Sequence, residues 1–127
     1  MGREKREDDM KTIRHTETLY YYDGPQIFIA KDNDNARYIV VCVDSGYIGD
    51  TFLVSKVSYE RIVHFRTGLI DLRTLLVDSS KDGWFIGKHE RGCDQEIILE
   101  QQRGPIKDNQ YLPDSGFFLQ GNLRAAT

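Results

Sequence analysis

Tyr38-Ile39-Val40-Val41-Cys42-Val43 is the stretch of sequence that decides the fold. Successive side chains of a β-strand point to opposite faces, so both faces of this strand are apolar. A strand with two apolar faces has to be covered on both sides. We therefore expect it to lie centrally in a sheet, with other elements packed over it.

Further strands are predicted on either side of this stretch. Asp32–Asn35 separates it from the strand before, and Asn and Asp side chains suit a hairpin loop because they tolerate left-handed backbone and bond their own backbone. The predicted strands around the central one are Leu19–Tyr22, Gln26–Lys31, Thr51–Val57, Trp84–Gly87 and Glu96–Glu100.

A pair of short capped helices interrupts the strands. Ser58 suits the N-cap of a helix over Tyr59–Thr67, because its hydroxyl can accept a hydrogen bond from a free amide of the first turn. Gly68 fits the left-handed position just past that helix, and Asp71 can cap a second helix that ends by Asp78. One face of the first helix carries Tyr59, Ile62, Val63 and Arg66.

Together these elements predict an α+β fold. We expect a bent, mainly antiparallel sheet of about five to six strands with two short helices packed on one face, in the order β-β-β-β-α-α-β-β. Residues 1–16 alternate in charge and carry almost no apolar side chain, which predicts a flexible tail. Residues 17–120 are then a single domain, and residues 121–127 a C-terminal tail.

Composition limits the classes of partner that the protein can have and indicates its cellular compartment. The 17 Lys and Arg residues are outnumbered by 20 Asp and Glu residues, and the net charge of −3 disfavours nucleic acid as a partner. No apolar run approaches the roughly 20 residues of a membrane span. Cys42 lies in an apolar strand and Cys93 in a polar loop, which does not suggest a disulfide. We predict a cytoplasmic protein without a membrane partner.

No catalytic, metal or cofactor signature stands out. His89 and Cys93 make half of a zinc site, and Cys42 would have to supply a third ligand from the middle of a strand. His64 lies beside the apolar stripe of the first helix, where a lone His is more often structural than catalytic. No glycine-rich phosphate loop follows a strand. We predict no catalytic residue, no metal and no cofactor, and we lean against an enzyme.

Aromatic residues indicate a surface for a protein partner. Tyr20, Tyr21 and Tyr22 are consecutive on a strand, so at least one of them points away from the packed face. Such side chains are enriched at protein interfaces, although the stronger interpretation is that helices and the C-terminal chain cover both faces of the sheet. The candidate interaction residues are Tyr20, Tyr22, Tyr47, Trp84, His64 and Arg66.

Several motifs resemble a small bacterial domain family of unknown function. They are the strand end Tyr22-Asp23-Gly24-Pro25, the strand Ala30-Lys31-Asp32, the strand end Val43-Asp44, the helix start Val57-Ser58-Tyr59-Glu60-Arg61 and the helix Gly68-Leu69-Ile70-Asp71-Leu72-Arg73. Tyr59 and Leu69 depart from the family pattern. The resemblance covers about residues 19–84. It implies a fold and a bacterial or phage-linked context, and it transfers no catalytic residue.

The function expected from these observations is a non-enzymatic protein-interaction module of bacterial or phage origin, such as an accessory or inhibitor in phage defence or counter-defence. Its partner would be another protein or a second copy of the chain. One alternative is an enzyme or small-molecule-binding domain, which requires His64, Asp71 and Cys93 to share a pocket. A second alternative is a nucleic-acid accessory protein, which requires one basic face built from Arg61, Arg66, Arg73 and Lys88.

Overall fold

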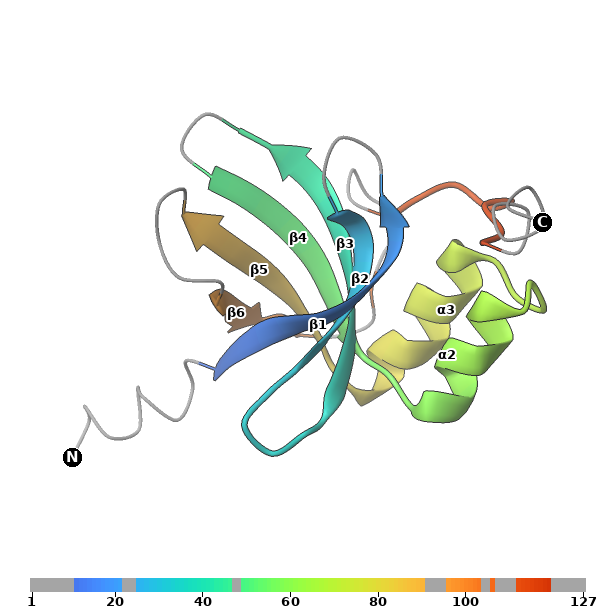
Figure 1. Ribbon diagram of the computed structural model, residues 1–127, viewed down its shortest axis with the longest axis horizontal. Coiled ribbons are helices and arrows are strands. Elements are labelled where there is room, and N and C mark those ends of the chain that lie inside the picture. The colour runs from blue at the N-terminus through green and yellow to red at the C-terminus, as the bar shows by residue number, and fades with distance from the viewer. Residues whose placement is uncertain are drawn as a thin grey trace.

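Six antiparallel strands close into a barrel in a computed structural model of the chain, in the order β1-β2-β3-β4-β5-β6 (Figure 1). The structure describes residues 11–21, 25–46, 49–90, 96–103, 106 and 112–119. The strands are β1 (Lys11–Tyr21), β2 (Pro25–Lys31), β3 (Arg37–Ser45), β4 (Gly49–Lys56), β5 (Trp84–Glu90) and β6 (Glu96–Gln101). The helices are α2 (Tyr59–Arg66), α3 (Leu72–Ser79) and the short 3₁₀-helix η1 (Ser80–Asp82).

The central strand, β3, is buried on both faces, as the sequence predicts. Tyr38 and Val40 belong to an apolar cluster made of strand residues, which fills the inside of the barrel. Ile39 and Val41 belong to a second cluster, which includes buried residues of α2 and α3. The two helices pack beside the barrel (Figure 1). The protein therefore has one core inside the barrel and another between the barrel and its helices.

The barrel closes because β1 pairs with two neighbours. Residues 14–21 of β1 pair with β2, and residues 11–14 pair with residues 96–99 of β6. Ile13 lies opposite Ile97 in this second pairing, is 1% exposed and belongs to the inner cluster. An ion pair between Arg14 and Glu96, 3.1 Å from Nη2 to Oε2, crosses the same seam on the outside.

The predicted open, bent sheet with helices on one face is wrong, because the sheet closes on itself. Residues 11–16, which the sequence analysis assigns to the flexible tail, form the first half of β1. Their strand signal is weak because Ile13 is the one apolar side chain that this half of β1 points into the barrel. Residues 1–10 of the predicted N-terminal tail lie outside the described residues. So do residue 120, at the end of the predicted domain, and residues 121–127, the predicted C-terminal tail.

Gly87 on β5 allows the barrel interior to be packed tightly. A Cβ atom added there would lie 2.8 Å from Cγ2 of Ile97 and 3.1 Å from Cγ2 of Val54, both of which belong to the inner cluster. Real Cβ atoms essentially never lie as close as 2.8 Å to such a neighbouring atom. The space that a side chain of β5 would occupy is thus filled by its neighbours on β4 and β6.

Ile13→Ala tests the seam between β1 and β6. The change leaves a cavity inside the barrel, so we expect the free energy of unfolding in urea to fall by about 2–4 kcal/mol. Ile98→Ala is the matched control, because Ile98 is in the same strand pairing but is 47% exposed. That variant should lose less than about 1 kcal/mol. Equal losses from the two variants would contradict a packed interior at this seam.

Candidate functional site

A groove of about 610 Å³ runs between α2 and the outer face of β1, β2 and β3. Its β1 wall is formed by Thr16 and Glu17, and Ile29 and Lys31 of β2 lie next to them. Arg37 of β3 and one face of α2 complete the lining. That helix face carries Tyr59, Ile62, Val63, Arg66 and Thr67, and the first four are those predicted to share a face.

Both ends of α2 are fixed by the capping residues that the sequence predicts. The Ser58 hydroxyl accepts a hydrogen bond of 3.3 Å from the amide of the third helical residue. Gly68 has a positive φ of 82°, and its amide donates to the Phe65 carbonyl over 3.1 Å. The Leu69 amide donates to the His64 carbonyl over 2.9 Å, which completes a Schellman motif. These caps set where the helical wall of the groove begins and ends.

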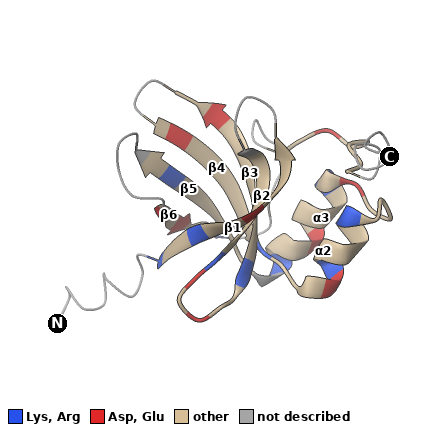
Figure 2. Cartoon of the chain, viewed as in Figure 1, with Lys and Arg blue, Asp and Glu red and all other residues tan. Residues whose placement is uncertain are grey.

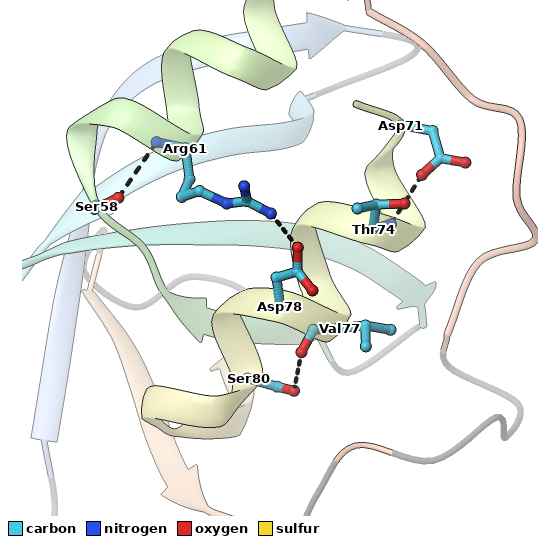
Figure 3. A network of polar contacts seen from close by, with 7 residues as sticks. All are labelled: Ser58, Arg61, Asp71, Thr74, Val77, Asp78 and Ser80. Carbon is cyan, nitrogen blue, oxygen red and sulfur yellow. Dashed lines mark hydrogen bonds and ion pairs between the residues drawn. The ribbon is translucent and has the colours of Figure 1, made fainter. Parts of the chain in front are cut away.

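The two helices are tied to each other by one ion pair. Arg61 of α2 donates from Nη2 to Oδ2 of Asp78 on α3 (Figure 3). Asp71 caps α3 by accepting from the Thr74 amide over 2.9 Å, also visible in Figure 3. Ile62 and Phe65 anchor α2 in the outer core. The groove wall is therefore held by packing below and by α3 at its side.

Two cations lie at one end of the groove. Lys31 and Arg37 are directly opposite each other in the β2–β3 pairing, so their side chains leave the sheet on the same side. The Arg37 guanidinium lies 5.4 Å from the centre of the Tyr59 ring, within the range of a cation–π interaction. Neither cation has an ion-pair partner among the described residues.

The loop between β2 and β3 explains how these cations are positioned. Asp32 accepts hydrogen bonds from the amides of Asp34 and Ala36 and from the Tyr38 hydroxyl, over 2.8, 3.0 and 2.8 Å. Burial alone would raise the pKa of the Asp32 carboxyl, but these hydrogen bonds outweigh burial and lower it. Burial and the Asp32 carboxylate raise the pKa of Tyr38. This polar cluster holds the predicted hairpin loop and has a structural role.

The other end of the groove holds an ion pair. Arg66 of α2 donates from Nη1 to Oε2 of Glu17 over 2.5 Å. Glu17 follows an irregularity in the β1–β2 register, which shifts between His15 and Glu17. At that irregularity the Thr16 hydroxyl donates to the Ile29 carbonyl over 2.9 Å. Irregularities of this kind redirect side chains, and here the Glu17 carboxylate faces α2.

The four predicted interaction residues that the structure describes do not gather in one place. Arg66 lines the groove, whereas His64 is half-buried on α2 and does not line it. Trp84 is 8% exposed and lies in the outer core. Tyr20 is half-buried, with its ring 5.3 Å from that of Phe117 in an edge-on contact. Tyr22 and Tyr47 lie outside the described residues.

Sequence reasoning missed most of the groove. The sequence predicts that Tyr59 and Arg66 share a helix face, but it does not connect Lys31, Arg37 or Glu17 with them. Lys31 and Arg37 flank the predicted hairpin loop, so their opposition could have been inferred from that loop. The contact between Glu17 and Arg66 joins residues 49 positions apart and has no local signal.

A second hollow, of about 530 Å³, lies beside the segment 112–119, which we call the strap. Ile27, Val41 and Leu72 contribute to its mainly apolar lining, together with strap residues. Hydrogen bonds hold the strap against the start of α3, one of them from Nη1 of Arg73 to the Pro113 carbonyl over 2.8 Å. The Gly116 amide donates to Oδ2 of Asp71 over 2.8 Å, and the Leu72 amide donates to the strap carbonyl of Phe117 over 2.9 Å.

Other chemistries find little support among the described residues. In that part of the chain, no group of three or more His, Cys, Asp or Glu side chains could hold a metal ion. Cys93, required for both the zinc and the enzyme hypotheses, lies outside it. Cys42 is a free cysteine whose thiol pKa is raised by burial. None of the described helices has the length and apolar character needed to cross a membrane.

Comparison with models of known families identifies the family of the chain. A model described as "Family of unknown function (DUF6575)" matches residues 12–127. The chain belongs to this family. The predicted resemblance to a domain family of unknown function is thus confirmed, and the match extends well past the residues that carried it. No curated protein and no solved structure matches the chain. The family description assigns no activity, so the function has to be argued from the groove.

Asp71→Asn and Asp71→Ala separate the two roles of Asp71. Asn can still cap α3, but its amide nitrogen cannot accept from Gly116, so we expect a loss of about 0.5–1.5 kcal/mol in the free energy of unfolding. Ala removes the cap as well and should cost about 1 kcal/mol more. Urea unfolding of both variants and the wild type measures these differences.

The same variants test the pH dependence of Asp71. Hydrogen bonds from Thr74 and from the Gly116 amide lower the pKa of this carboxyl below its ordinary value of 3.8. The native state therefore binds fewer protons than the unfolded state in acid, and this stabilisation is lost as the pH falls below about 3.8 and through the native pKa. The gap between wild type and Asp71→Asn should narrow from pH 6 to pH 3. A gap that stays constant would exclude this role.

Proposed function

We propose that the protein is a non-enzymatic interaction module that binds an acidic segment of another protein in the groove between α2 and β1–β3. The observation that carries this proposal is the gathering of Lys31, Arg37 and Arg66 in one groove, with Glu17 as the one carboxylate among the described lining residues. A cationic groove attracts carboxylates and gives specificity through charge complementarity.

The local charge of the groove differs in sign from the charge of the chain. The full sequence carries a net charge of −3, whereas the described residues of the groove lining include three cations and one carboxylate. Because exposed charges are screened beyond about 8–10 Å in physiological salt, a ligand in the groove responds mainly to the lining. The groove therefore favours an anionic segment even though the whole protein is acidic.

The side chains of the groove suit a protein partner. Tyr59 is 64% exposed at the first position of α2 and is one of the largest exposed apolar surfaces on the described chain. Tyr and Arg are enriched among the residues that contribute most to protein interfaces, and here Arg37 lies over Tyr59. This pair offers a flat, preassembled contact surface at the end of the groove.

Neither alternative function gains a comparable observation. His64 and Asp71 line neither the groove nor the second hollow. The basic residues required for nucleic-acid binding are divided among the helices and β5, which Figure 2 shows well apart. Arg61 and Arg66 are in ion pairs, and Arg73 donates to the Pro113 carbonyl over 2.8 Å. A role in phage defence, a bacterial or phage source and self-association stay predictions from the sequence.

Selection from a library of displayed random 12-residue peptides, with the full chain as target, tests the proposed function. We expect enrichment of Asp and Glu together with aliphatic residues. Binding of enriched peptides should weaken about tenfold, or about 1.4 kcal/mol, when Lys31 and Arg37 are both changed to Glu. It should also weaken as salt is raised.

Lys81→Glu with Lys88→Glu is the matched control, because it changes the net charge equally at exposed positions outside the groove. This variant should bind within about twofold of the wild type. Enrichment of neutral or basic peptides, or equal weakening by the two double variants, would contradict binding in the groove. Urea unfolding of each variant confirms that the fold is retained.

A further inference from the structure

The groove has cations at both ends, separated by a defined length of helix. Tyr59 and Arg66 lie seven residues apart on α2 and both line the groove, which places them two turns apart, about 10.5 Å along the helix axis. Arg37 and Lys31 mark the Tyr59 end. The two centres of positive charge are thus separated by several residues' length of an extended chain.

Three aliphatic residues also line the groove. Ile62 and Val63 occupy the α2 wall between Tyr59 and Arg66, and Ile29 lies two residues before Lys31 on β2. Ile29 and Ile62 belong to the outer core, and Val63 is half-buried. Ile29 and Ile62 are each 4% exposed, so an aliphatic side chain placed in the middle of the groove would mainly remove the remaining exposed surface of Val63 from water.

One carboxylate already occupies the Arg66 end, and it comes from the protein itself. Glu17 and Arg66 are 48% and 43% exposed, so their ion pair is in contact with solvent. Exposed pairs contribute little to stability, and replacing Glu17 by another carboxylate at Arg66 therefore costs little. The pair shows that this end of the groove accepts a carboxylate in direct contact.

From this spacing we infer that the groove binds an extended segment with acidic residues at its first and fifth positions and an aliphatic residue at its third. In an extended chain these three side chains share one face, and the outer two are about 13 Å apart. One acidic side chain would contact Lys31 and Arg37, and the other would displace Glu17 from Arg66. This inference rests on the proposed function and specifies its ligand.

Three fluorescein-labelled peptides test the spacing by anisotropy with the full chain. Their central residues are Asp-Ser-Leu-Ser-Asp, the rearranged Asp-Asp-Leu-Ser-Ser, and Asp-Ser-Ser-Ser-Asp, each flanked by Gly-Ser. The first should bind at least about fivefold tighter than either of the others. Equal binding of the first two would overturn the spacing and leave a general acidic-segment function standing. Equal binding of the first and third peptides would show that the aliphatic residue makes no favourable contact with the groove.

Glu17→Gln tests the displacement step. Removal of the internal competitor should tighten binding of the first peptide about threefold, because Arg66 is then available to the ligand. Glu60→Gln is the matched control: Glu60 is exposed on the same helix, does not line the groove, and its change should leave affinity within the error of the measurement. Unchanged or weaker binding by Glu17→Gln would overturn displacement. If no acidic peptide binds the wild type at millimolar concentration, the proposed function fails as well.

Discussion

Four residue pairs between β1 and β6 turn a meandering sheet into a barrel, and the rest of the structure depends on that closure. Closure creates an interior that has to be filled by side chains of all six strands, with Ile13 and Ile97 facing each other across the seam. The interior has no room for a side chain at Gly87, where β4, β5 and β6 come close together. Tight packing inside leaves the outer face of β2, β3 and β4 as the place where the helices can pack.

The groove is a consequence of covering that outer face with short helices. Eight residues of α2 cover the barrel beside β1 without reaching across it, so a hollow remains along β1 and β2. The end of β2 supplies Lys31, the start of β3 supplies Arg37, and β1 supplies Glu17 next to its register shift. These polar groups come from three different strands. The arrangement of charges in the groove is therefore a property of the fold and not of any single motif.

The parts of the structure with local signals could be predicted from the sequence, and the parts that depend on distant contacts could not. The two apolar faces around Tyr38–Val43 and the caps at Ser58, Gly68 and Asp71 follow from strand and helix periodicity, and the structure confirms them. The closing half of β1 has one inward apolar residue, Ile13, too few for a strand signal. The contacts of Arg37 with Tyr59 and of Glu17 with Arg66 depend on tertiary packing alone.

The seam also has a consequence for how the chain reaches its native state. Its pairing joins residues at least 82 positions apart, the separation of Arg14 and Glu96, whereas the β2–β3 and β3–β4 pairings join near neighbours in the chain. Bringing together residues that are far apart in the chain costs the most conformational entropy, and this cost comes before the contacts contribute any favourable energy. The meander and the helix pair can therefore form early, with ring closure as the late step. Contacts that form late act mainly on the rate of unfolding, so we expect changes in the four pairs of the seam to alter the unfolding rate more than the folding rate.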